Sequence, residues 1–95
     1  MTMKALSRSS HPRLGIGCRV RIVENGDTLL LLPEGILRLK GTAAEIIRLC
    51  DGEHSFADIV EAMQAQYRSS DPQRIEQEAE SFLNRLQERR AVDFQ

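Results

Sequence analysis

The residues best suited to chemistry in this chain of 95 residues are Cys50 and His54. A thiol and an imidazole four positions apart can ligate a metal ion, but a structural zinc site normally needs four ligands. Only one other cysteine, Cys18, and one other histidine, His11, occur in the sequence. The ligand set is incomplete, so we expect a buried cysteine at a helix end, a solvated loop after it, and no bound metal or cofactor.

Catalysis by a nucleophile or by an acid–base pair has equally little support. The sequence contains neither a nucleophile elbow nor a glycine-rich phosphate loop. Glutamates recur over residues 73–89, but they alternate with arginines, which is typical of a solvated helix face. One modest core is all that this length supports, with little room for an enclosed active site. We therefore predict a binding module that is not an enzyme and has no catalytic residues.

Charge and hydropathy restrict the partners. A net charge of -1 gives no general attraction for polyanions, and the helix expected after Ser55 has no basic residue before Arg68. The longest apolar run, Leu29–Leu32, is too short to cross a membrane, and Met1–Ser10 lacks the apolar core of a signal peptide. We expect a cytoplasmic protein with reduced thiols and with neither a nucleic-acid nor a membrane partner.

Three strands are expected first. Cys18–Val23 largely alternates apolar and polar residues, and the Asn25-Gly26 pair after it predicts a type I′ hairpin turn. A second turn, Pro33–Gly35, is interpreted as a three-residue loop that leads into a third strand over Ile36–Lys40. These turns predict an antiparallel meander. Its core face is expected to hold Val20, Ile22, Leu29, Leu31, Leu37 and Leu39.

Helical periodicity then replaces the two-residue period. Thr42–Glu45 matches a capping box, and Gly52 can end the helix in a left-handed conformation. Ser55 opens a second helix in a similar way, with an apolar stripe that extends to Tyr67.

A third helix is expected over residues 73–89. Asp71 and Pro72 read as its N-cap and first residue, and Val92 and Phe94 are expected to fold back and close the core. The order of elements predicts an α+β, winged-helix-like fold, in which a three-stranded antiparallel sheet precedes a three-helix bundle. Residues 1–17 are predicted to be a flexible arm whose end, at 12–14, lies against the domain formed by residues 18–95.

The third strand of such a meander has one unpaired side. Ile36–Leu39 is short, apolar and free of internal proline, so a peptide can add beside it as a fourth strand. The alternative is an edge covered by the third helix or by a second copy of the chain. The residues alone leave these two interpretations open.

Several short motifs between Pro12 and Val92 together resemble one known family. The most telling segment is Leu39–Gly52, LKGTAAEIIRLCDG, and further matches are Pro12-Arg13-Leu14, Leu32-Pro33-Glu34-Gly35 and Phe82-Leu83 with Leu86. In this set the chain is similar to the pyrroloquinoline quinone biosynthesis protein D (PqqD) family. The family commonly has Asn where Lys40-Gly41 stands here, so the start of the first helix is open to differ.

The resemblance implies a peptide chaperone without a cofactor of its own. Members of this family bind the precursor peptide PqqA and present it to the radical S-adenosylmethionine enzyme PqqE, which cross-links a Glu and a Tyr of that peptide. In related domains the peptide adds to the third strand, in a groove shared with the third helix. Carried onto this chain, the peptide-binding residues are Ile36, Leu37, Arg38, Leu39, Ala79, Phe82, Leu83 and Leu86.

A monomer is expected as the binding form, because a dimer through the same edge would compete with the peptide for its hydrogen bonds. Homodimers are expected only at high concentration or in crystals. The alternative function is a stand-alone winged-helix interaction or regulatory module that binds DNA or another protein.

Overall fold

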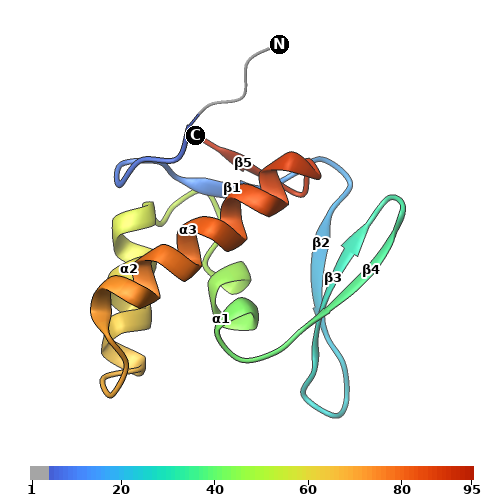
Figure 1. Ribbon diagram of the computed structural model, residues 1–95. Coiled ribbons are helices and arrows are strands. Elements are labelled where there is room, and N and C mark those ends of the chain that lie inside the picture. Colours follow the sequence, from blue (N-terminus) through green and yellow to red (C-terminus); the bar gives the residue numbers. More distant parts are fainter. Residues whose placement is uncertain (1–4) are drawn as a thin grey trace.

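The computed structural model describes residues 5–95, and in this part of the chain three helices pack with two small antiparallel sheets (Figure 1). The elements in chain order are β1 (Pro12–Leu14), β2 (Arg19–Ile22), β3 (Thr28–Leu32), β4 (Gly35–Leu39), α1 (Thr42–Arg48), α2 (Phe56–Gln66), α3 (Pro72–Glu88) and β5 (Val92–Phe94). Strands β2, β3 and β4 form one sheet in that order, and β1 pairs with β5 in the other. The predicted α+β fold, a three-stranded antiparallel sheet followed by three helices, is confirmed.

The predicted register of the three-stranded sheet is wrong by one residue at both turns. The first loop holds three residues, because the Val23 N–H donates to the Asp27 carbonyl at 3.0 Å. Gly26 adopts a φ of 89° in this loop, as expected of a three-residue hairpin with a glycine in the left-handed region. The second loop holds only two residues, since Gly35 already pairs with Leu32.

Because of the shifted register, each side chain of β3 points to the face of the sheet opposite to the one predicted. Leu30 and Leu32 are buried in the core, where Leu29 and Leu31 were expected, and the latter two lie half-buried on the outer face. The side chains of β2 and β4 keep their predicted faces, because a shift of one residue at each turn moves only the strand between them. Ile22 shares the core face but lies at its end and is 57% exposed.

The helix starts agree with the sequence at two of three positions. Ser55 and Asp58 form the predicted capping box at α2, and the Asp71 side chain accepts from the Gln73 N–H ahead of α3, with Pro72 in the first turn. The capping box expected at Thr42 is absent: Gly41 is the N-cap of α1, with a φ of 59° and no side-chain cap. Thr42 is therefore already helical, and its hydroxyl is not in the N-cap position.

The N-terminal segment takes part in the fold from Arg8 onward. The Phe56 N–H donates to the Ser10 carbonyl at 2.7 Å, and the Ala57 N–H donates to the Arg8 carbonyl at 3.0 Å. These bonds satisfy donors in the first turn of α2 that have no partner within the helix. Pro12–Leu14, the end of the arm that was expected to lie against the domain, forms β1 and pairs with β5, and residues 1–4 of that arm lie outside the described residues.

The β1–β5 ribbon closes the core over the helices. Val92 and Phe94 are buried, as predicted, and Leu14 pairs with Val92 (Figure 1). Beneath them the core side chains come from the inner face of the β2–β3–β4 sheet and from all three helices. The most deeply buried include Leu30, Ile47, Ile59, Val60, Met63 and Leu83.

Candidate functional site

The backbone of β4 has a free side. In a hairpin with a two-residue loop the residues that flank the loop exchange both hydrogen bonds, and bonded pairs then alternate along the ladder. The observed register places Gly35, Leu37 and Leu39 in the bonded pairs with β3. The N–H and C=O groups of Ile36 and Arg38 consequently point away from β3, toward the edge of the sheet.

The side chains of β4 divide between two faces. Ile36 is 64% exposed and lies with Arg38 on the outer face, where the Arg38 Nε is 3.4 Å from the Asp27 Oδ2. Leu37 is half-buried and Leu39 is buried, both against the core. A chain that pairs with this edge would contact the side chain of Ile36 and the backbone of Arg38, with Leu37 partly accessible beneath it.

The four residues predicted on α3 differ in how accessible their side chains are. Ala79, Leu83 and Leu86 are almost completely buried in the core, whereas Phe82 is half-buried at its margin. Residues spaced by three or four share a helix face, and here that face covers the protein interior. Of the predicted helix wall, Phe82 is thus the residue with surface left to contact a ligand.

Phe82 lines a hollow of about 350 Å³ between α1 and α3, which the sequence analysis missed. The hollow begins three residues after the end of β4, at Thr42, so it continues the β4 edge along the chain. Small side chains at Ala43 and Ala79 leave this space open beside Phe82. The lining residues that were not predicted include Thr42, Ala43, Ile46, Ile75, Glu78 and Arg85.

The sequence signal that could have located the hollow is a pair of small residues, Ala43 and Ala79, together with an aromatic one, Phe82. This signal becomes informative only once α1 and α3 are known to pack against each other.

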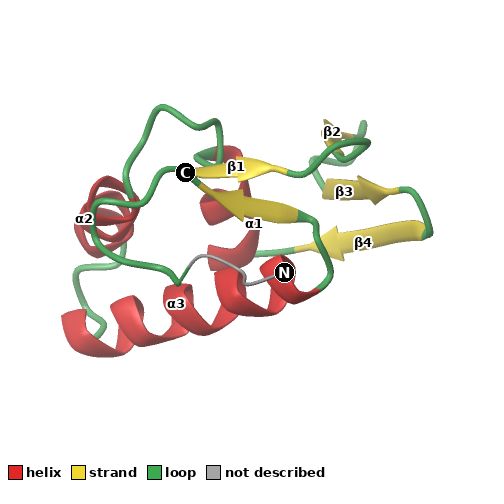
Figure 2. Ribbon diagram, turned by 90° about the horizontal axis from the view of Figure 1, so that it is seen from above, coloured by secondary structure: helices red, strands yellow, loops and turns green. Residues whose placement is uncertain are grey.

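The end of α3 approaches the β3–β4 turn. Seen from above in Figure 2, the C-terminal half of α3 and β4 are drawn in neighbouring positions. An ion pair of 3.8 Å between Arg89 and Glu34 joins the end of α3 to the β3–β4 turn. The hollow at Phe82 lies at the opposite end, beside the start of α1. The β4 edge at Ile36 and Arg38 together with the accessible residues of the α1–α3 hollow is called the groove, and only part of the predicted set belongs to it.

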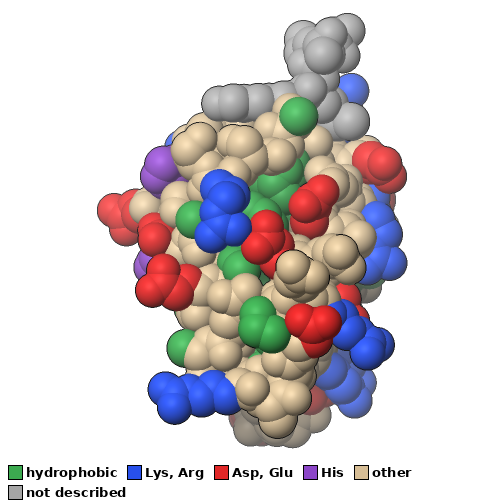
Figure 3. Space-filling view, turned by 60° about the vertical axis from the view of Figure 1, so that its left-hand side comes forward, with side chains coloured by type: hydrophobic (Ala, Val, Ile, Leu, Met, Phe, Trp, Pro, Cys, Tyr) green, Lys and Arg blue, Asp and Glu red, His purple; other side chains and the backbone are tan. Residues whose placement is uncertain are grey.

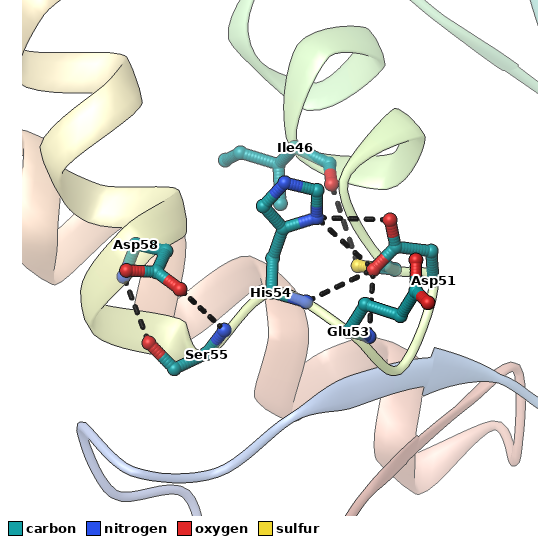
Figure 4. A network of polar contacts seen from close by, with 7 residues as sticks. Ile46, Asp51, Glu53, His54, Ser55 and Asp58 are labelled. Atoms are coloured by element: carbon teal, nitrogen blue, oxygen red, sulfur yellow. Dashed lines mark hydrogen bonds and ion pairs between the residues drawn. The ribbon is translucent and has the colours of Figure 1, made fainter.

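The Cys50–His54 segment forms a compact network that joins α1 to α2 (Figure 4). The Asp51 Oδ1 accepts from the Glu53 N–H at 2.8 Å and from the His54 N–H at 3.0 Å, and the His54 Nδ1 lies 2.8 Å from the Asp51 Oδ2. The Cys50 thiol donates to the Ile46 carbonyl at 3.3 Å. In residues 5–95 no group of three His, Cys, Asp or Glu side chains is arranged to hold a metal ion.

The ionisation of this segment fits a structural role. Burial, with a smaller contribution from the neighbouring Asp51 carboxylate, raises the pKa of the Cys50 thiol to about 12. Partial burial opposes ionisation of Asp51, but hydrogen bonds from Glu53 and His54 outweigh it and lower its pKa to about 2. At neutral pH the thiol is therefore protonated and unreactive, and the carboxylate is a charged acceptor for the loop.

Charges of both signs are interspersed on the face shown in Figure 3, with hydrophobic side chains in small patches between them. Binding to the phosphates of nucleic acid needs an excess of basic side chains on the contacting face. This face therefore gives no support to a DNA-binding surface. Within residues 5–95, no helix combines the length and the hydropathy needed to cross a bilayer.

Comparison with known proteins identifies relatives along most of the chain. A sequence model of the family described as "Coenzyme PQQ synthesis protein D (PqqD)" matches residues 27–92. A "PqqA binding protein" of Azotobacter vinelandii (strain DJ / ATCC BAA-1303) is 37% identical over 66 residues, which cover 70% of this chain and 70% of that protein. A "PqqA binding protein" of Methylococcus capsulatus (strain ATCC 33009 / NCIMB 11132 / Bath) is 43% identical over 42 residues. That match covers 44% of this chain and less than half, 45%, of the M. capsulatus protein.

Two solved structures share the fold. The solution NMR structure of the PqqD truncation of Methylobacterium extorquens PqqCD superimposes with a TM-score of 0.74 at 31% identity, and covers 94% of this chain and 95% of that one. It is described as a functional, stand-alone recognition element for ribosomally synthesized and post-translationally modified peptides. The heterocyclase TruD contains the same fold in 12% of its chain, with a TM-score of 0.61 at 23% identity over 90% of this chain.

Proposed function

Because the chain belongs to the PqqD family, we propose that it is a peptide chaperone of pyrroloquinoline quinone biosynthesis that binds the precursor peptide PqqA. Two relatives are described as PqqA binding proteins, and a solved relative is described as a peptide recognition element. The observation that carries the proposal is the free edge of β4, which is followed along the chain by the hollow at Phe82.

The peptide adds to β4 as a fourth strand. The outward N–H and C=O groups of Ile36 and Arg38 give four backbone hydrogen bonds, each contributing about 0.5–1.5 kcal/mol net. Alternate side chains of the peptide then point to opposite faces of the extended sheet. One set lies beside Ile36 on the outer face, and the other faces Leu37, Phe82 and the α1–α3 hollow.

Binding in this way holds only a segment of the peptide and leaves the remainder free for an enzyme. The chain presents that free part to the radical S-adenosylmethionine enzyme PqqE, and its contribution is to raise the local concentration of the peptide at the enzyme. The chain is not an enzyme itself, and the binding form is a monomer, because self-pairing through β4 would consume the same backbone groups.

An NMR titration of the ¹⁵N-labelled chain with synthetic PqqA tests the binding site. We expect the largest shift changes at the amides of β4 and around Phe82, and small changes in the loop between α1 and α2. Changes confined to α2 and the loop after it, with β4 unaffected, would contradict the proposal.

Presentation to the enzyme needs a separate measurement. Cross-linking of PqqA by PqqE, followed by mass spectrometry, should proceed faster with the chain than without it. A chain that binds PqqA but leaves this rate unchanged would restrict its function to peptide binding.

A further inference from the structure

Arg85 is an unneutralised charge at the rim of the α1–α3 hollow. It is exposed and lines the hollow, and within residues 5–95 its side chain has no ion pair or hydrogen bond. The two other arginines that flank it along the groove side of α3 are engaged: Arg74 lies 3.2 Å from Glu78, and Arg89 lies 3.8 Å from Glu34. Among these three arginines, Arg85 therefore supplies the free positive charge on the α3 side of the groove.

Arg85 lies on the side of α3 that carries the hollow. Glu78, Phe82, Arg85 and Arg89 follow one another at spacings of four, three and four residues, which brings them to one side of α3. Phe82 lies at the hollow beside the start of α1, and Arg89 lies at the β3–β4 turn. Arg85 is thus located along α3 between the residue at the hollow and the residue at that turn.

We propose that Arg85 makes the groove selective for a peptide that carries an acidic side chain close to an apolar one. This inference rests on the proposed function, because it concerns the same groove. The hollow, floored by Ile46, Ala79 and Phe82, accepts the apolar side chain. The Arg85 guanidinium binds the carboxylate, because its planar N–H groups can donate to both carboxylate oxygens at once.

The spacing of the two peptide residues follows from the geometry. Arg85 lies three residues, or about 4.5 Å of helix rise, from Phe82. Side chains on one face of a strand are separated by two residues, about 6.6 Å, so the apolar and acidic residues belong at positions i and i+2. The apolar residue comes first in a strand antiparallel to β4, because α3 and β4 run in opposite directions along the groove.

Calorimetric titrations with synthetic PqqA test this inference through a charge swap. We expect Arg85→Glu to weaken binding about tenfold and Arg85→Gln to have a smaller effect, because the pair lies at a partly exposed rim. Peptides in which each Asp or Glu is replaced in turn by Lys identify the partner. One of them should bind Arg85→Glu at least as tightly as it binds the unmodified chain.

Arg68→Glu is the matched control, because it makes the same change in net charge in the exposed segment between α2 and α3. It should bind PqqA as the unmodified chain does, and far-UV circular dichroism should show that all variants are folded. If the unmodified chain binds but Arg85→Glu and Arg68→Glu have equal affinities, or no Lys peptide restores binding, the inference is wrong and the proposed function stands. If the unmodified chain does not bind PqqA, the proposed function itself fails.

Discussion

Two regions of the molecule differ in how their backbone polar groups are hydrogen-bonded. These regions are the loop between α1 and α2 and the edge of β4. In the loop, Asp51 accepts from two backbone N–H groups, and Ser55 and Asp58 cap α2 reciprocally. At the β4 edge, the groups of Ile36 and Arg38 point away from the sheet. The loop thus stabilises the fold with contacts of its own, whereas the edge keeps four hydrogen-bonding groups that no other strand of the sheet uses and that an added chain can pair with.

This difference predicts that changes in the loop alter the stability of the fold, and that changes at the groove alter peptide binding. Residues that belong to both the core and the groove test how sharply the two properties separate.

Leu83 and Phe82 are neighbours on α3 with different surroundings. Their substitution is expected to have the largest effects on stability and on peptide binding. Leu83 is completely buried, so Leu83→Ala should lower the free energy of unfolding by about 2–5 kcal/mol. Phe82 is half-buried at the hollow, so Phe82→Ala should cost less stability and weaken PqqA binding more. Urea unfolding and calorimetric titration of both variants measure this. A greater loss of affinity in folded Leu83→Ala than in Phe82→Ala would place the hollow outside the binding site.

Arg38→Pro should weaken PqqA binding up to about tenfold, the equivalent of one lost hydrogen bond, while the chain remains folded. Proline removes the outward N–H at this position without touching the bonds to β3. Arg38→Ala, which loses the ion pair with Asp27 but keeps the N–H, should bind almost normally.

Ile22→Pro is the equivalent change at the opposite edge of the sheet. Its N–H also points outward, because Val23 and Arg21 are in the bonded pairs with the hairpin partner. It should leave the affinity unchanged. Equal loss of binding in Ile22→Pro and Arg38→Pro would remove the distinction between the two edges.

Ser55→Ala should destabilise the chain by about 1 kcal/mol, because it leaves the Asp58 N–H at the start of α2 without its side-chain acceptor. The affinity for PqqA should remain within about twofold, since the loop lies outside the groove. Chemical unfolding and the same titration measure the two quantities. A clear loss of affinity in the folded variant would show that the loop and the groove are coupled.

Acid should weaken the loop. The pKa of Asp51 is lowered from 3.8 to about 2 in the folded chain, so its charged form stabilises the fold above about pH 4 and this contribution is lost as the pH falls toward 2. Asp51→Asn keeps an oxygen acceptor but does not titrate. The free energy of unfolding should therefore fall less in this variant than in the unmodified chain between pH 5 and pH 2. Parallel curves would contradict the assigned pKa.

Local sequence was sufficient wherever a structural rule involves only a few neighbouring residues. Ser55 with Asp58 and Asp71 with Pro72 define helix starts through bonds within one turn, and both were predicted correctly. Gly52 was predicted to end the first helix in a left-handed conformation; its φ is 80°, but α1 already ends at Arg48, with Leu49 as its C-cap. The motifs from Leu39 to Gly52 identified the PqqD family because they follow one another in a fixed order along the chain.

The register of the sheet was decided by the tertiary structure. Four consecutive leucines, Leu29–Leu32, make β3 apolar on both faces, so the residues carry no alternation that says which face is buried. The two hairpin loops, one residue longer and one residue shorter than predicted, and the packing of Leu30 and Leu32 on the helices decide it. The same limit applies to the hollow at Phe82, because its two walls belong to helices about thirty residues apart in sequence, and only their packing brings them together.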